Sequence, residues 1–251
     1  LRGTAGQKGP VEDGKVEMES ISSRLGRTTI EITDLCKSYG DKVLIKDYTY
    51  FFLKDDRIGY IGPNGSGKST LMKMIVGWIK PDSGTIEIGQ TVKLGYFSQE
   101  NEDMDTSLKV IDYIKNVAEY VKTKDGSISA SQMLERFLFP PSVQYTVIEK
   151  LSGGARRRLY LLKILMSAPN VLILDEPITG LDPASTQDFY AVIRHLNRDE
   201  KVAVLMVSHD IGNIVTQANK ILQLKQTVQF YGTVDEYKKS EFGREFLGGE
   251  N

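Results

Sequence analysis

The sequence contains a single cysteine, Cys36, among its 251 residues. One cysteine cannot form a disulfide within the chain, and a zinc site assembled from several cysteines is excluded for the same reason. This scarcity is typical of proteins that fold in a reducing compartment. We therefore expect Cys36 to be a buried structural thiol.

Long apolar runs and an excess of charge of one sign are also missing. The longest apolar stretches, Val171–Leu174 and Val202–Val207, are far shorter than the roughly 20 residues that span a bilayer. Lysine and arginine total 32 residues against 33 for aspartate and glutamate, so no net basic field attracts nucleic acid or acidic lipid. We expect a cytoplasmic protein with no transmembrane segment in this chain.

The spacing of apolar residues predicts alternating strands and helices. Strands are expected over 28–35, twice within 42–61, twice within 85–98, and from Val171 and Val202. Helices are expected over 68–78, 108–122, 129–139, 154–166 and 184–196. Because strands and helices alternate, the sheet is predicted to be mostly parallel, and the middle section to form a separate helical lobe.

A glycine-rich loop follows the strand that ends at Ile61. Residues 62–69 match the pattern G-x-x-x-x-G-K-[ST] and precede a helix, which is the context that a phosphate-binding loop requires. Glycine amides wrap a triphosphate closely because no Cβ intervenes, and the helix N-terminus adds positive potential. Lys68 is predicted to reach the β- and γ-phosphates, and Ser69 to bind Mg²⁺. The predicted nucleotide-binding residues of this segment are Gly62, Pro63, Asn64, Gly65, Ser66, Gly67, Lys68, Ser69 and Thr70.

Two acidic residues and a histidine follow buried strands. Asp175 and Glu176 come directly after one continuous apolar run, and His209 ends the next. Ligands bind at the carboxyl ends of such strands, so Asp175 is predicted to hold Mg²⁺ and Glu176 to polarise the attacking water. His209 is predicted to contact the γ-phosphate or to orient that water. An acidic pair also occurs in solvated turns, so these roles depend on the phosphate loop; His195, in a polar helix, is assigned no function.

The tetrapeptide Leu-Ser-Gly-Gly at residues 151–154 precedes a basic helix and lies between the phosphate loop and Asp175. In this order the motifs resemble those of ABC ATPases, and the resemblance extends from Thr28 to about Leu247. It implies an α/β fold with a P-loop NTPase core, an N-terminal antiparallel β subdomain and an inserted α-helical subdomain.

The same resemblance implies a single ABC ATPase domain over residues 16–251, with its helical subdomain at about residues 100–165. Residues 1–15, rich in glycine and charge, are expected to be a flexible tail.

Further roles follow from the resemblance. Tyr39 would stack on adenine, Gln99 would serve catalysis and Mg²⁺ binding, Asp182 would belong to the D-loop, and His209 would be the switch histidine. Tyr39 packing against the fold and Gln99 acting as a turn residue remain alternatives.

The tetrapeptide implies that the active unit is a dimer. In the family, Ser152 and the amides of Gly153 and Gly154 complete the ATP site of the opposite subunit, either a second copy or a second ABC ATPase domain. Relatives usually carry Gln or Glu at the next position, where this chain has Ala155. We expect nucleotide binding to survive this change and hydrolysis or dimerisation to weaken.

The chain resembles two branches of the superfamily. Residues 16–175, with Gly-Tyr-Phe-Ser-Gln at 95–99, are similar to the second ATPase domain of ABC-F proteins, which are cytosolic and ribosome-associated. Residues 176–247, with Val-Ser-His-Asp at 207–210, resemble the ATP-binding subunit of zinc or manganese importers. The sequence is therefore interpreted as a possible hybrid, with a ribosome or a membrane permease as its partner. A permease would hold it at the inner face of the membrane.

Two functions from different classes fit these motifs. The first is an ATPase that binds Mg-ATP and hydrolyses it to drive a partner contacted through residues 99–147. The alternative is an ATP-dependent binding switch or scaffold with little hydrolysis, which Ala155 leaves open. A small-molecule kinase with a phosphate loop is disfavoured because it would leave residues 151–154 without a purpose.

Overall fold

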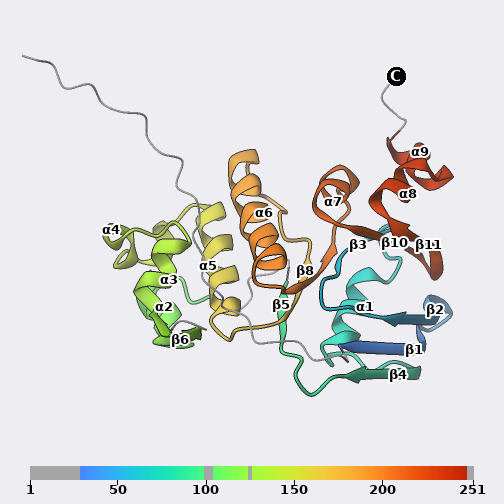
Figure 1. The fold of residues 1–251 in the computed structure, drawn as a ribbon, viewed down its shortest axis with the longest axis horizontal. Helices are drawn as coiled ribbons and strands as arrows, with labels where there is room; N and C mark the ends of the chain where they lie inside the picture. The colour runs from blue at the N-terminus through green and yellow to red at the C-terminus, as the bar shows by residue number, and fades with distance from the viewer. Residues whose placement is uncertain (1–28, 99–103, 124–125, 248–251) are drawn as a thin grey trace, which may run out of the picture.

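The computed structural model describes residues 29–98, 104–123 and 126–247. The flexible tail predicted at residues 1–15 lies outside these ranges, as does Gln99. In the described part, a six-stranded sheet lies at the centre, with a three-stranded antiparallel sheet on one side and a helical lobe on the other (Figure 1).

The central sheet has the strand order β11-β10-β3-β9-β8-β5. Neighbours from β10 to β5 pair in parallel, and β11 pairs antiparallel with β10. The bounds are β3 Arg57–Ile61, β5 Leu94–Phe97, β8 Val171–Asp175, β9 Ala203–Val207, β10 Lys220–Lys225 and β11 Thr227–Thr233. The mostly parallel sheet predicted from the alternation of strands and helices is confirmed.

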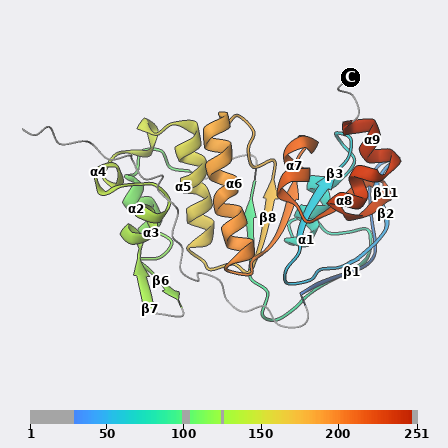
Figure 2. The ribbon, with the colours of Figure 1, turned by 45° about the horizontal axis from the view of Figure 1, so that its top comes forward.

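The apolar runs are continuous because both faces of the sheet are covered. Along β8, Leu172 and Leu174 pack into one core, whereas Val171 and Ile173 pack into the other. Figure 2 shows α5 and α6 side by side over the first face. The helices of the central region are α1 Lys68–Ile75, α5 Gly153–Leu165, α6 Pro183–Arg198, α7 Ile211–Gln217, α8 Val234–Lys239 and α9 Glu241–Leu247.

The antiparallel subdomain consists of β1 Ile30–Tyr39, β2 Lys42–Phe51 and β4 Ser83–Ile88, in the order β2-β1-β4. Cys36 lies on β1 and is only partly buried, so the predicted core thiol is wrong. The β1–β2 register shifts between Leu35 and Lys37, and the backbone N–H of Asp47 donates to the Cys36 sulfur at 3.3 Å. An irregular strand pair thus turns this side chain toward polar neighbours.

The helical lobe contains α2 Val110–Lys115, α3 Ala130–Arg136, α4 Pro141–Gln144 and the 3₁₀ turn Ile148–Lys150. The helix predicted over 108–122 is wrong in its second half, because Tyr120–Thr123 (β6) pairs with Gly126–Ser129 (β7) as an antiparallel ribbon. Valine, threonine and tyrosine favour strands, and the Asp-Gly pair at 125–126 is a hairpin signal that the helical spacing masked. None of the described helices is both long and apolar enough to cross a bilayer.

Candidate active site

The phosphate loop connects β3 to α1, and its backbone requires glycine. Gly62 has φ +150° and Gly67 has φ +98°, conformations that other residues rarely adopt. A Cβ on Gly62 would collide with the carbonyl oxygen of Leu224, and one on Gly67 would lie 3.0 Å from the carbonyl oxygen of Leu44. The glycines therefore let the loop pass close to β10 and β2.

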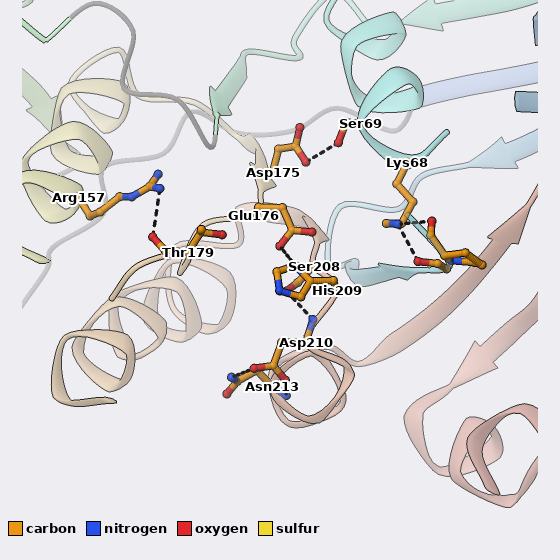
Figure 3. Close-up of polar contacts among 12 residues, drawn as sticks. Lys68, Ser69, Arg157, Asp175, Glu176, Thr179, Ser208, His209, Asp210 and Asn213 are labelled. Carbon is orange, nitrogen blue, oxygen red and sulfur yellow. Dashed lines mark hydrogen bonds and ion pairs between the residues drawn. The ribbon is translucent and has the colours of Figure 1, made fainter. Parts of the chain in front are cut away.

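Lys68 is the first residue of α1, and its side chain folds back over the loop (Figure 3). Its ammonium donates to the carbonyl oxygens of Gly62 at 2.8 Å and Pro63 at 3.1 Å. The residue is only 6% exposed, and this burial lowers the pKa of Lys68, against the opposing effect of the Glu176 and Asp175 carboxylates. A cation is thus held at the centre of the loop.

Asp175, at the carboxyl end of β8, is 5% exposed. Its Oδ1 accepts a hydrogen bond from Ser69 Oγ at 2.9 Å, and its Oδ2 accepts one from Tyr96 Oη at 2.8 Å. Two of the three residues predicted to bind Mg²⁺, Ser69 and Asp175, are therefore in direct contact. Tyr96, which sequence reasoning missed, comes from the neighbouring strand β5.

Glu176 and His209 form a second polar pair at the same edge of the sheet (Figure 3). His209 Nδ1 lies 2.9 Å from Glu176 Oε2, with the histidine ring largely exposed. Glu176 has φ +49°, a conformation that costs energy in a residue other than glycine, and its N–H donates to Val207 O at 2.9 Å. Strained backbone conformations of this kind cluster at functional sites, where they fix the direction of a side chain.

A cavity of about 570 Å³ joins these groups. It is lined by Tyr39, Lys42, Leu44, Asn64, Gly65, Gly67, Lys68, Ser69, Thr70, Glu176 and His209. Nine of these were predicted from the sequence, whereas Lys42 and Leu44 were missed. Lys42 Nζ lies 3.1 Å from the position that a Cβ on Gly65 would occupy, so a second cation faces the loop. Lys42 could have been predicted from its position just after the turn at 40–41, close in sequence to Tyr39.

A second cavity of about 480 Å³ shares Glu176 and His209 with the first. Its other lining residues are Ile178, Thr179, Gly180, Leu181, Pro183, Thr186, Gln187, Ser208, Asp210 and Asn213. Asp182, beside this cavity, caps α6: its carboxylate accepts from Ser185 N at 2.9 Å and Ser185 Oγ at 2.6 Å. The Ser185 hydroxyl, followed by the Ser185 N–H, lowers the pKa of Asp182.

The signature loop, residues 151–154, leads into α5. Ser152 caps that helix, accepting from the N–H of Ala155 at 3.2 Å, and Gly153 and Gly154 begin it. None of Ser152, Gly153 and Gly154 is among the described residues that line the first cavity. Within one chain, the fold thus brings together the phosphate loop, Asp175, Glu176 and His209, and leaves the signature loop out of their cavity.

Arg157, on α5, is a buried connection that sequence reasoning did not single out. Its guanidinium donates to Thr179 O at 3.4 Å (Figure 3) and to Ser98 O at 3.2 Å. The guanidinium carbon also lies 5.4 Å from the centre of the Phe97 ring. Burial lowers the pKa of Arg157. Because Ser98 follows β5 and Thr179 follows Glu176, this side chain connects α5 to two segments that border the site.

Replacing Arg157 with methionine is expected to lower the free energy of unfolding by about 2 kcal/mol, because hydrogen bonds from a charged donor are lost and two carbonyls lose their partner. For a chain of this size that corresponds to a fall in Tm of about 4–8 °C in thermal denaturation. The control is Arg156→Met, whose guanidinium donates to Glu149 O in the 3₁₀ turn before α5 and makes no described hydrogen bond to Ser98 or Thr179. Equal losses of Tm in both variants would contradict the connecting role of Arg157.

Residues 45–179, which include the phosphate loop, Asp175 and Glu176, match the ABC transporter family. The chain belongs to this family. It is an ABC ATP-binding domain, and such domains are ATPases that bind ATP, generally with Mg²⁺, and work as dimers.

Its relatives include ABC-F proteins, one of the two branches that the sequence suggested. The chain is 48% identical over 205 residues to the uncharacterized ABC transporter ATP-binding protein YfmR of Bacillus subtilis, covering 81% of this chain and 32% of the relative. It is 35% identical over 230 residues to the energy-dependent translational throttle protein EttA of Escherichia coli, covering 89% of this chain and 41% of the relative. The chain therefore spans less than half the length of these relatives.

Solved structures support the fold alone. The ADP conformation of the ATP-binding cassette MJ1267 aligns with a TM-score of 0.72 at 19% identity, over 89% of this chain and 99% of that one. The dimeric post-hydrolysis state of the cassette MJ0796, bound to ADP and Pi, aligns with a TM-score of 0.67 at 21% identity, over 82% of this chain and 99% of that one.

The hybrid interpretation stays a prediction. Because the EttA alignment covers 89% of the 251 residues, it necessarily extends past residue 176. Strands β8 and β9, which come from either side of that position, pair along their whole length. The two segments therefore form one sheet and share one core.

Proposed function

We propose that this domain hydrolyses Mg-ATP at a site shared with a second copy of itself or with a second ABC ATPase domain, and thereby drives a partner. One observation carries the proposal. A single chain gathers Lys68, Ser69, Glu176 and His209 around one cavity, whereas Ser152, the other predicted phosphate contact, does not line it. A second protomer would supply the signature loop that this cavity lacks.

The residues at the edge of β8 fit a magnesium ion. A serine hydroxyl and a carboxylate lie 2.9 Å apart beside the phosphate loop, and oxygen ligands of this kind suit Mg²⁺, which keeps waters and phosphate oxygens as its other ligands. When bound, the ion would neutralise charge that develops on the phosphates. Ser69 and Asp175 would hold it, with Gln99, outside the described residues, as a further candidate ligand.

Binding of the nucleotide would use the rest of the cavity. The exposed ring of Tyr39 at the end of β1 would stack on adenine, and the loop amides with Lys68 would hold the phosphates. Lys42, facing Gly65, would add a second positive charge. These contacts fix the γ-phosphate near Glu176.

Hydrolysis would depend on the Glu176–His209 pair. The carboxylate of Glu176 would accept a proton from the attacking water, and the 2.9 Å contact with His209 would hold that carboxylate in place and stabilise its charge. The second cavity, which shares both residues and contains the segment around Asp182, would receive the opposite protomer. Communication between the two sites would pass through this segment.

The proposed partner is the translation machinery or a membrane permease, with the domain acting in the cytoplasm or against the inner face of the membrane. EttA, which aligns over 89% of this chain, is named as a translational throttle, whereas YfmR is named as an uncharacterized ABC transporter ATP-binding protein. The helical lobe would make the contact, because α2 and α3 pack against α5, which Arg157 ties to Ser98 and Thr179 beside the site.

Mixing two inactive variants tests the shared site. Glu176→Gln disables catalysis at a protomer's own phosphate loop, whereas Ser152→Glu places a negative charge where that protomer should meet its partner's phosphates. In a mixed dimer both lesions fall in one site and the other site is intact. Random pairing should restore about a quarter of the wild-type phosphate release, since half the dimers are mixed and each retains one site. A mixture no more active than its components would contradict a composite site.

A further inference from the structure

The carboxylate of Asp175 is held from two sides. Ser69 Oγ, from α1, donates to Oδ1 at 2.9 Å, and Tyr96 Oη, from β5, donates to Oδ2 at 2.8 Å. Tyr96 pairs with Ile173 in the parallel ladder, two residues before Asp175, so the two side chains project from adjacent strands. A phenol keeps its proton at neutral pH, so Tyr96 is the donor in this contact and the carboxylate is the acceptor.

Tyr96 is itself braced by Trp78. The two ring centroids lie 4.7 Å apart with an interplanar angle of 64°, an edge-to-face arrangement that aromatic pairs favour. Trp78 follows α1, and its backbone N–H donates to Lys73 O at 2.9 Å. The residue is 64% exposed. The ring contact joins the end of α1 to β5, beside the strand that ends in Asp175.

We infer that Tyr96 is a positioning residue for magnesium binding, with Trp78 as its brace. The inference rests on the proposed function and deepens it. Ser69 is itself a predicted Mg²⁺ ligand, so its hydroxyl would have to serve both the ion and Asp175. Tyr96 carries no such second duty, so it fixes the plane of the carboxylate whether or not Ser69 is engaged.

A merely structural tyrosine would behave differently. Tyr96→Phe keeps the ring, its packing against Trp78 and the strand propensity, and removes only the hydroxyl that reaches Asp175. A packing role predicts no change in metal affinity. A positioning role predicts weaker metal binding with no loss of affinity for nucleotide alone.

The test uses Mn²⁺ as the probe, with a non-hydrolysed ATP analogue and the electron paramagnetic resonance signal of free Mn²⁺ as the readout. We expect Tyr96→Phe to raise the Kd for Mn²⁺ about fivefold, the effect of losing one hydrogen bond to a charged group held also from the other side. Affinity for the analogue without metal should be unchanged. In the ATPase assay, the half-saturating Mg²⁺ concentration should rise by the same factor and kcat at saturating Mg²⁺ should change less than twofold.

The single tryptophan supplies an independent signal. Emission of Trp78 should change as Mn²⁺ and the analogue bind, with the midpoint displaced equally in Tyr96→Phe. The matched control is Tyr113→Phe, which removes a tyrosine hydroxyl from α2 in the helical lobe and should leave the Mn²⁺ affinity at the wild-type value.

Three results would count against the inference. Wild-type Mn²⁺ affinity in Tyr96→Phe overturns it, and so does an equal loss of affinity for the metal-free analogue, which would indicate a general defect of the loop. If the unmodified chain binds the analogue and no Mn²⁺, the magnesium site of the proposed function fails and the inference fails with it. Trp78→Leu provides a second variant, expected to weaken Mn²⁺ binding about twofold in the same direction.

Discussion

Lys68→Ala is expected to weaken Mg-ATP binding by about 100-fold, the loss associated with removing a charged donor from phosphate oxygens in a water-poor site. Lys68 is held at the centre of the loop by the carbonyls of Gly62 and Pro63, at 2.8 and 3.1 Å. No other described cation lining the first cavity, apart from Lys42 at its rim beside Gly65, is placed to compensate. Titration with a fluorescent ATP analogue at fixed ionic strength measures the effect.

The control for this variant is Lys73→Ala, on the same helix and outside the cavity lining. It removes the same charge from the chain and should leave the Kd within about twofold, because a screened surface charge contributes little at that distance. Thermal denaturation of both variants separates lost binding from lost structure. Equal affinity of Lys68→Ala and the wild type for ATP would contradict the assignment of residues 62–69 as the phosphate loop.

Glu176→Gln is expected to reduce the rate of phosphate release about 1,000-fold while changing ATP affinity only a few-fold, since general base catalysis typically contributes a factor of 10² to 10⁴. The glutamine amide keeps the size of the side chain and its reach to His209, but it cannot accept a proton from water. Single-turnover phosphate release measures the first quantity, and equilibrium nucleotide titration the second. With hydrolysis blocked, ATP-bound dimer should accumulate and elute earlier in size-exclusion chromatography.

The same experiment separates the two candidate functions. Turnover by the wild type that is lost in Glu176→Gln supports an ATPase that drives a partner. Binding of ATP by both proteins with no turnover in either would support the alternative, an ATP-dependent switch, and would make Ala155 the first position to restore to glutamine. Turnover at the wild-type rate in Glu176→Gln would show that another group is the base, with His209 the nearest candidate.

Local patterns predicted much of the fold. Strands β8 and β9 are buried on both faces, so their sequences are continuously apolar and stop where the strand stops. The phosphate loop could be predicted for a similar reason. Residues other than glycine are excluded at positions 62 and 67, because φ is positive there and the neighbouring backbone lies close. These constraints restrict which residue types can occupy neighbouring positions, so they can be recognised in a short stretch of sequence.

Local patterns misled where two structures compete for the same residues. The segment around Tyr120–Thr123 continues the helical spacing of α2, and the structure places it in a ribbon with Gly126–Ser129. Pairing with β7 favours the strand over the helix for these residues. A pattern of helical spacing within residues 108–122 does not include β7, so it could not reveal this pairing. The partial exposure of Cys36 has a similar origin, because it follows from a register shift against β2.

The contacts that complete the site belong to the tertiary structure. Tyr96 reaches Asp175 across 79 residues of sequence and Arg157 reaches Ser98 across 59, since β5 pairs with β8 and α5 packs over that pair. By itself the sequence determined where the glycine-rich loop lies and where the buried strands end, because those properties depend on nearest neighbours along the chain. Which distant side chains meet was decided only by the order of strands in the sheet, which no short stretch of sequence encodes.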